Sequence, residues 1–513
     1  MLGIGEYILL LIILFFIIST LFTKFVAVGL IVIVTSLTFW KLNEYSNYWK
    51  KRNIPSPKGK LGIGNIIELF ENFKNSDERW KKKFGKTYGL MMGLTPDITT
   101  TDLNIIKEVY VKQFEKFIDR ETFFPGSNKK EKSLFAHGMF MLRGDDWRRV
   151  RNLSSPAFTT GKMKMFVTFF NETANKTLEL LKNYELEDKP IDIKKMCDGM
   201  TLDSIFKSTF GLKTDLQEDP NNIVRKNAKK VFDANVYDPR VYFNYHIKDD
   251  KEIKFFTDLL SQCYEKRKKE LKEVNDDDDN KEKDEDIMFE NATKSQKAKG
   301  MSKIEILAQG FLFLLAGYET TASTINFLLF MLANHQEYQE KCREEILDAL
   351  QGKDINYIDY DTVNKLNYLD QCVKECLRMF PPAGKINRIC VEKTTINGIE
   401  FEPGTMVSVP IFNLHYDEEI YPQPNIFDPE RFSTEQKAGR DPLYYMPFGY
   451  GPRNCIGMRF AYLSIKIYIA RFLTKYRFKT CKESVPLPLE IATVSLTKPK
   501  DTLYLKVETI SNL

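Results

Sequence analysis

The sequence predicts a mainly α-helical protein with a small β region, preceded by an N-terminal transmembrane anchor. Residues 7–40 are almost wholly apolar, and a second long apolar stretch with helical spacing follows Ser302. Short β signals flank residues 87–100, and an Asn397-Gly398 pair indicates a hairpin. Hydrophobic residues make up 43% of the 513 positions, so the chain can bury a large core.

The first element is the apolar run from Tyr7 to Trp40, which is interrupted by Lys24 and a few hydroxyls. About 20 apolar residues span a bilayer, so the run predicts a transmembrane anchor over residues 1–40. A cleaved signal peptide fits less well, because the run is too long and no Lys or Arg precedes it. Lys24 leaves open one tilted span or a hairpin of two spans. The single span is preferred because each half is slightly short.

Residues 41–58 form a basic, proline-rich hinge between the anchor and a body over residues 59–513. Basic side chains are absent before the apolar run, whereas Lys41, Lys50, Lys51 and Arg52 follow it. The positive-inside rule therefore predicts that the body faces the cytosol. The eight cysteines are scattered and include no C-x-x-C pair, which agrees with a reducing compartment.

Charge and histidine content argue against several function classes. The chain has 75 basic and 70 acidic side chains, a balance too even to indicate a nucleic-acid-binding protein. The four histidines show no metal-ligand spacing, and H-E-x-x-H is absent, which argues against a zinc hydrolase. The sequence also has no G-x-S-x-G elbow and no Walker-type phosphate loop. An acidic run from Asn275 to Asp286 is too charged to pack and predicts a solvated loop.

The longest predicted helix begins after Ser302 and runs to about Asn334. Ser302 and Glu305 have the spacing of a capping box, and the stretch is apolar on nearly all sides, as buried helices are. Its centre, residues 316–321, reads A-G-Y-E-T-T and breaks the apolar pattern. Such a violation is expected at a functional site. A structural alternative is a back-bonded hydroxyl with a paired Glu319.

A glycine-rich segment near the C-terminus, residues 446–460, leads into a predicted helix with Cys455 near the junction. Glycines allow tight turns and a close approach of the backbone to a flat ligand. Backbone N–H groups at a helix N-terminus stabilise a thiolate, and Arg453 places a cation two residues from the sulfur. An ordinary buried cysteine is the alternative interpretation.

Four ordered motifs together resemble those of the cytochrome P-450 family. The pattern F-x-x-G-x-R-x-C-x-G is similar to the haem-binding loop of that family and is formed by Phe448, Gly451, Arg453, Cys455 and Gly457. Residues 316–321 resemble its oxygen-binding I helix, residues 375–378 the E-x-x-R of its K helix, and residues 429–432 its P-E-R-F motif. The sequence around residues 147–151 most resembles the animal microsomal branch that contains the drug-metabolising 3A subfamily and nematode relatives.

The resemblance implies the cytochrome P-450 fold and a haem b (iron protoporphyrin IX) cofactor. Cys455 would be the metal ligand, as a thiolate that favours O–O cleavage, and Phe448 would limit solvent beside the sulfur. Gly451 and Gly457 belong to the same cofactor-binding loop. The residues expected to bind the two anionic propionates are Trp147, Arg151, Arg388 and Arg453, with Arg120 as a weaker candidate.

The resemblance also implies catalytic and structural roles. Glu319 and Thr320 would relay protons to dioxygen. Glu375, Arg378 and Arg431 would form a buried ion-pair network. A set of phenylalanines predicts a pocket for a lipophilic substrate, namely Phe117, Phe123, Phe124, Phe135 and Phe140.

The expected reaction inserts one oxygen atom of dioxygen into a steroid, fatty acid or xenobiotic, at the cytosolic face of the endoplasmic reticulum membrane. Electrons would come from NADPH through a separate cytochrome reductase, because the chain has no nucleotide-binding G-x-G-x-x-G of its own. Cytochrome b5 is a further candidate partner. Two alternatives are a haem-thiolate isomerase or dehydratase that acts on a peroxide, and a non-catalytic haem sensor or carrier. The presence of both Glu319 and Thr320 favours the monooxygenase.

Overall fold

The computed structural model describes residues 4–21, 24–121, 134–232, 251–277, 300–493 and 496–510. Phe123, Phe124 and residues 278–286 of the acidic run lie outside the described residues. The first part of that run, residues 275–277, is the helical end of α12 rather than a loop. A helix can extend into a charged stretch because its backbone bonds need no apolar partner.

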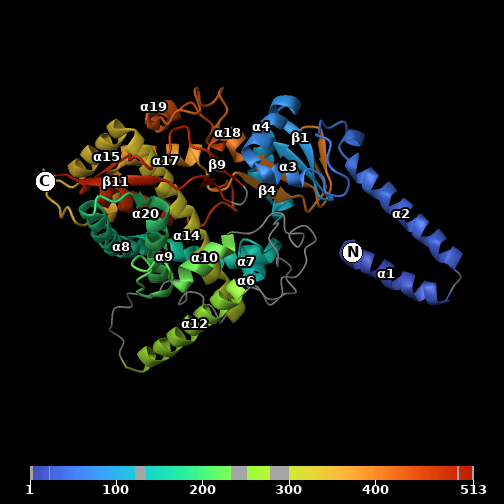
Figure 1. The fold of residues 1–513 in the computed structure, drawn as a ribbon, viewed down its shortest axis with the longest axis horizontal. Coiled ribbons are helices and arrows are strands. Elements are labelled where there is room, and N and C mark those ends of the chain that lie inside the picture. The colour runs from blue at the N-terminus through green and yellow to red at the C-terminus, as the bar shows by residue number, and fades with distance from the viewer. Residues whose placement is uncertain are drawn as a thin grey trace.

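Helices dominate the architecture, as the sequence predicts (Figure 1). The α-helices are α1 (Ile4–Leu21), α2 (Lys24–Ser46), α3 (Ile66–Glu71), α4 (Phe73–Phe84), α5 (Leu103–Lys107), α6 (Leu134–His137), α7 (Gly144–Ser154), α8 (Thr160–Leu186), α9 (Ile193–Phe210), α10 (Ile223–Phe232), α12 (Lys251–Asp277), α14 (Lys303–Asn334), α15 (Gln336–Ala349), α16 (Tyr360–Lys365), α17 (Asn367–Met379), α18 (Ile411–His415), α19 (Thr434–Lys437) and α20 (Met458–Leu473). The strands are β1 (Thr87–Met92), β2 (Thr95–Thr100), β3 (Ile191–Asp192), β4 (Lys385–Ile389), β5 (Thr394–Ile396), β6 (Ile399–Phe401), β7 (Met406–Pro410), β8 (Tyr476–Lys479), β9 (Ile491–Ala492), β10 (Lys498–Pro499) and β11 (Tyr504–Thr509).

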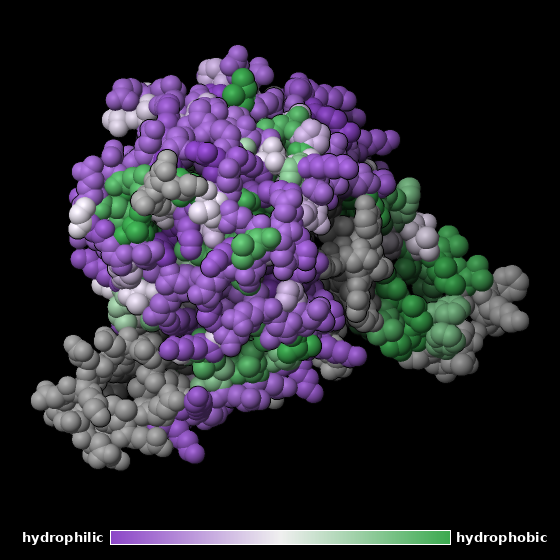
Figure 2. All heavy atoms as spheres, turned by 60° about the vertical axis from the view of Figure 1, so that its left-hand side comes forward, coloured by the Kyte–Doolittle hydropathy of each residue, from purple (hydrophilic) through white to green (hydrophobic). Residues whose placement is uncertain are grey.

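The apolar N-terminal segment forms two helices, α1 and α2, which contact each other and lie to one side of the body (Figure 1). We expected one continuous span, but the segment forms two helices. The first ends at Leu21 and the second begins at Lys24, the charged residue that interrupts the apolar run. Large apolar side chains within residues 7–16 and 28–40 are exposed on this helix pair, and Figure 2 shows an apolar region beside a largely hydrophilic body. None of the helices in the described part of the chain combines the length and hydrophobicity of a membrane span.

The β region comprises a four-stranded sheet with the order β1-β2-β7-β4, together with a three-stranded sheet and two two-stranded ones. Strand β7 runs parallel to β2 and antiparallel to β4, and the pairing sets Arg388 of β4 opposite Val407. The predicted hairpin is confirmed as β5 and β6. Its turn residues Asn397 and Gly398 have φ values of 50° and 77°, as a type I′ turn requires.

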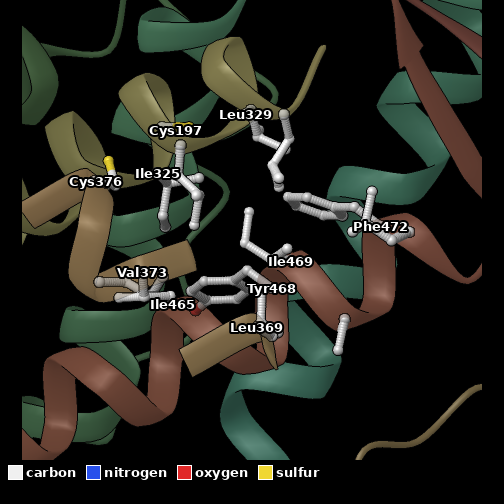
Figure 3. Packing of buried hydrophobic residues seen from close by; sticks show 14 of the residues in the cluster. Cys197, Ile325, Leu329, Leu369, Val373, Cys376, Ile465, Tyr468, Ile469 and Phe472 are labelled. Atoms are coloured by element: carbon white, nitrogen blue, oxygen red, sulfur yellow. The ribbon is translucent and has the colours of Figure 1, made fainter. Parts of the chain in front are cut away.

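Helix α14 lies at the centre of the helical core and contacts α6, α9, α17 and α20. The predicted capping box is confirmed, because Ser302 and Glu305 each accept the backbone N–H of the other. Figure 3 shows side chains of α9, α14, α17 and α20 packed against one another, including Cys197, Ile325, Val373 and Tyr468, which are all fully buried. This packing fixes α14, and therefore its polar centre, relative to the segment that precedes α20.

Candidate active site

Cys455 lies three residues before α20, at the end of the glycine-rich loop. Its backbone N–H donates to the carbonyl oxygen of Phe448 over 2.9 Å, which closes the loop on itself. Burial raises the pKa of the Cys455 thiol, while the N–H of Gly457 and the cations of Arg151 and Arg120 act in the opposite direction. Cys455 is nonetheless an exposed residue, so it is accessible although protein surrounds it.

Gly451 is the position at which the loop needs a glycine. Its φ of 74° lies in the left-handed region, and a Cβ there would come within 2.0 Å of the carbonyl oxygen of Tyr110. Gly449 also has a positive φ, of 71°, yet the nearest atom to its Cβ would be 3.9 Å away. The loop therefore lies directly against the backbone of Tyr110 at Gly451, but not at Gly449.

The polar centre of α14 is partly accessible as well. Ala316 is exposed although most of this helix is buried, and Thr320, one turn later, is partly accessible. The Thr320 hydroxyl donates to the carbonyl oxygen of Ala316 over 2.6 Å. Phe158 connects α14 to the cysteine loop, because its ring packs 5.6 Å from that of Phe313 and would lie 4.0 Å from a Cβ added to Gly457. The accessible face of α14 and the accessible sulfur thus belong to one neighbourhood.

Three guanidinium groups converge beside the loop, those of the buried Arg388 and Arg453 and of the half-buried Arg120. The Arg120 side chain donates to the carbonyl oxygen of Arg453, and Arg388 repels both other cations. Burial and this repulsion lower the pKa of Arg453 to about 9. Asp119 lies 3.9 Å from Arg453, and within the described part of the chain it is the one carboxylate recorded as an ion-pair partner of the three cations. All three Nε atoms are buried without a hydrogen-bond partner among the described residues.

Helix α7 adds two more of the predicted cofactor-binding side chains. Arg151 donates to the backbone oxygen and the side-chain oxygen of Asn454, at 2.8 and 3.1 Å, next to Cys455. The indole of Trp147 lies under the guanidinium of Arg453, 4.9 Å from ring centroid to carbon. The structure therefore brings the predicted set together, and it adds Arg120 as a full member of the cluster.

These residues fit a haem. Its macrocycle needs an accessible axial donor, and its propionates need cations. An exposed thiol beside a cluster of guanidinium groups with unpaired Nε atoms supplies both, because buried donors without a partner in a native protein are explained by a bound anion or water.

Glu319 points away from the accessible face of α14. Its carboxylate contacts Lys194 of α9 over 3.1 Å and Lys498 over 3.7 Å, and it accepts a bond from Ser323 at 3.4 Å. Burial raises the pKa of Glu319, but the two lysines outweigh that effect and hold the pKa below its usual range. Thr320 and Glu319 are therefore adjacent in sequence, but their side chains lie on different sides of α14.

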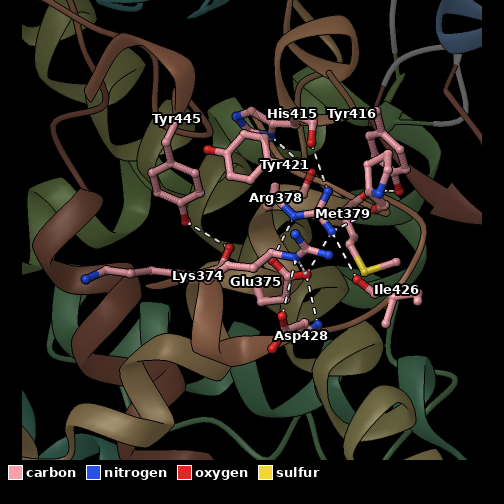
Figure 4. A network of polar contacts seen from close by, with 12 residues as sticks. Lys374, Glu375, Arg378, Met379, His415, Tyr416, Tyr421, Ile426, Asp428 and Tyr445 are labelled. Atoms are coloured by element: carbon pink, nitrogen blue, oxygen red, sulfur yellow. Dashed lines mark hydrogen bonds and ion pairs between the residues drawn. The ribbon is translucent and has the colours of Figure 1, made fainter. Parts of the chain in front are cut away.

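The E-x-x-R pair forms the predicted buried network (Figure 4). Arg378 donates from Nε and Nη2 to the two carboxylate oxygens of Glu375, at 2.7 and 2.8 Å, and both side chains are fully buried. Arg431 lies 3.4 Å from Glu375, and the N–H of Asp428 donates to the same carboxylate. Such a fork is geometrically matched to a carboxylate, which explains why an arginine occupies this position.

The predicted aromatic pocket is dispersed in the described residues. Phe117 is fully buried against Phe401 in the β-side core, so it packs as a structural side chain. Phe135 packs 5.1 Å from Phe311 of α14. Phe140 is 38% exposed, under the guanidinium of Arg120. Spacing in the sequence cannot separate these three environments, because all three residues lie in irregular or short elements.

A family model described as Cytochrome P450 matches residues 54–507, most of the chain. The chain belongs to the cytochrome P450 family. Similar curated proteins include Cytochrome P450 3A9 of Rattus norvegicus, 33% identical over 501 residues, with 93% of this chain and 96% of the relative covered. Cytochrome P450 3A16 of Mus musculus and Cytochrome P450 3A6 of Oryctolagus cuniculus are each 34% identical, with 90% of this chain and 92% of each relative covered.

This P450 is thus related to the 3A branch, as the motifs predict, and is a haem monooxygenase. Membership also implies a cysteine thiolate as the haem ligand. The predicted fold class is confirmed for the catalytic body, which is mainly helical with short strands.

Proposed function

We propose that Cys455 supplies the thiolate ligand of the haem and that the enzyme oxygenates lipophilic substrates such as steroids, fatty acids or xenobiotics. One observation carries the assignment of the cysteine. Of the eight cysteines, Cys455 is the exposed one, and it lies beside the cluster of Arg120, Arg388 and Arg453. The bound haem would activate dioxygen for transfer of one oxygen atom to the substrate and reduction of the other to water.

The side chains around Cys455 have distinct tasks in this proposal. Gly457 donates its backbone N–H to the sulfur, which stabilises the thiolate over the thiol. Phe448 packs 5.2 Å from Tyr462 and keeps water from that side of the sulfur. The guanidinium groups of Arg388 and Arg453 would hold the propionates, together with the indole N–H of Trp147 and the cations of Arg151 and Arg120.

Thr320 and Glu319 move protons in two different ways. The Thr320 hydroxyl is on the accessible face of α14, so it can release the carbonyl of Ala316 and hold a water instead. Glu319 is buried and kept charged by Lys194 and Lys498, so it holds a proton weakly and would pass one on readily. Because the two side chains lie on different sides of α14, a proton would have to travel from Glu319 to Thr320 through water.

We further propose that residues 1–40 anchor the enzyme in the endoplasmic reticulum membrane, with the body in the cytosol. The exposed apolar side chains of α1 and α2 support this, because an apolar surface of this size favours a membrane or another protein. Deletion of residues 1–40 is expected to release most of the enzyme from microsomal membranes and to leave haem binding intact. A truncated protein that folds but binds no haem would contradict the division into anchor, hinge over 41–58 and body.

Reconstituted turnover tests the proposed reaction. The purified enzyme would be combined with NADPH-cytochrome reductase, with and without cytochrome b5, in lipid, and lipophilic compounds would be screened first by their difference spectra. The proposal predicts an oxygenated product that requires NADPH, the reductase and dioxygen together. Product formation from a peroxide without NADPH would favour the isomerase or dehydratase, and binding without any turnover would favour a haem carrier.

A further inference from the structure

His415, at the end of α18, is a buried histidine that the proposed chemistry leaves unused. Its side chain is fully buried and its ring stacks on that of Tyr445, 5.5 Å between centroids. Nδ1 lies 3.0 Å from the carbonyl oxygen of Arg378, and Nε2 lies 3.1 Å from the backbone nitrogen of Met446. Both ring nitrogens therefore contact the backbone, one on each side of the imidazole.

The partners of His415 determine its tautomer. The Met446 nitrogen carries a hydrogen and can only donate, so Nε2 must accept. The Arg378 carbonyl can only accept, so Nδ1 carries the proton and donates. Burial and the neighbouring Arg378 cation lower the pKa of His415 to about 3, so this neutral form persists at neutral pH.

These bonds join the E-x-x-R network to the start of the cysteine loop. Arg378 returns a bond of 2.8 Å from Nη1 to the carbonyl oxygen of His415, so the two residues are paired in both directions (Figure 4). Met446 is the first residue of the loop, and its own carbonyl accepts the N–H of Gly449 over 3.0 Å. A chain of hydrogen bonds thus runs from the Glu375 carboxylate through Arg378 to His415. The imidazole of His415 extends it to the backbone of Met446, where the loop begins.

We propose that His415 is a positioning residue for the haem ligand: its Nε2 fixes the Met446 backbone, and thereby the path of the loop to Cys455. The inference rests on the proposed role of Cys455 as the ligand. The two bonds of the ring have different consequences. Loss of the bond to Arg378 weakens the core locally, whereas loss of the bond to Met446 frees the loop.

Three variants separate the two bonds. The amide of His415→Gln reaches the position of Nε2 and can accept from Met446. The shorter amide of His415→Asn reaches the position of Nδ1 and can donate to Arg378 only. His415→Phe keeps the stacking on Tyr445 and makes neither bond. For each, the full-length holoprotein would be assayed for the thiolate-type Soret band of its reduced, carbon-monoxide-bound form, alongside its thermal unfolding.

The proposal predicts that Asn and Phe lower the ratio of thiolate-ligated to unligated haem about tenfold, the order of effect of losing one buried hydrogen bond. Gln should stay close to wild type, even where Asn and Gln unfold at similar temperatures. Equal ligation in the Asn and Gln variants would overturn the inference. A wild-type enzyme without the thiolate band would instead refute the assignment of Cys455.

Discussion

Replacement of Gly451 by alanine is expected to displace the cysteine loop, whereas the same change at Gly449 is not. Both glycines have φ near 70°, and alanine in the left-handed region costs about 1–2 kcal/mol at either site. The difference lies in the surroundings. The added Cβ at residue 451 would be 2.0 Å from the Tyr110 oxygen, while that at residue 449 would have no atom closer than 3.9 Å.

The required displacement follows from ordinary contact distances. A carbon–oxygen contact of about 3.3 Å is the closest that backbones commonly show. The loop and Tyr110 must therefore separate by roughly 1.3 Å, the difference between that distance and the 2.0 Å imposed by the fold. Tyr110 cannot easily retreat, because it is fully buried with the guanidinium of Arg388 4.4 Å from its ring centroid. A shift of about 1 Å is enough to disable a preorganised site.

The assay compares haem content, the thiolate Soret band and thermal unfolding of the two variants with wild type. Gly449→Ala should unfold at a slightly lower temperature and keep the thiolate band. Gly451→Ala should lose most of that band. The reasoning would be refuted by a Gly451→Ala enzyme that retains the full band and is no less stable than Gly449→Ala.

Three further perturbations test other parts of the site. The pKa of His415 is lower in the folded state than its ordinary 6.5, so protonation below pH 6.5 favours the unfolded state. Lowering the pH from 7 to 5 should therefore reduce the free energy of unfolding of wild type by about 2 kcal/mol more than that of His415→Gln, measured from urea midpoints. An equal dependence of the two midpoints on pH would contradict this. Thr320→Ala should lower the product formed per NADPH oxidised, whereas the equally back-bonded but buried Thr324, changed to alanine, should not; equal ratios would remove Thr320 from proton delivery. Arg378→Lys keeps the charge but loses the two hydrogen bonds to Glu375, so the free energy of unfolding should fall by about 3 kcal/mol, measured by thermal unfolding. An unchanged midpoint would show that the network does not stabilise the fold.

Features specified by neighbouring residues could be read from the sequence. The capping box spans four positions, from Ser302 to Glu305, and the apolar pattern after it gave the helix that ends at Asn334. The turn at Asn397 and Gly398 needs two adjacent residues that tolerate positive φ. Such features depend on local sterics and hydrogen bonds, which a sequence window contains in full.

Contacts between distant parts of the chain could not be read in this way. Tyr110 determines why residue 451 is glycine, yet nothing in its own neighbourhood indicates a role in the loop. Lys194 pairs with Glu319 across 125 positions, and its spacing to Asp198 predicts no more than an ordinary helical ion pair. The family resemblance supplied the positions of Arg388 and Arg453, whereas their mutual crowding became visible in three dimensions only.

The direction of the Glu319 side chain shows most clearly what a sequence motif cannot predict. Adjacent acid and alcohol residues predict a joint proton relay, but successive residues on a helix are about 100° apart, so neighbours need not face the same space. Lys194 and Lys498 attract the carboxylate to the other side of α14. Helical geometry alone could have raised this objection, although it could not have named the two lysines.

The ligand assignment is tested most directly by the Soret band of the reduced, carbon-monoxide-bound enzyme before and after Cys455→His. Wild type should show the red-shifted band of a thiolate ligand, and the variant should lose it while retaining a folded body. Cys481→Ser is a matched control, because Cys481 is a partly exposed thiol outside the haem-binding loop, and its loss should leave the band unchanged. A red-shifted band that persists in Cys455→His, or that disappears in Cys481→Ser, would contradict the central claim.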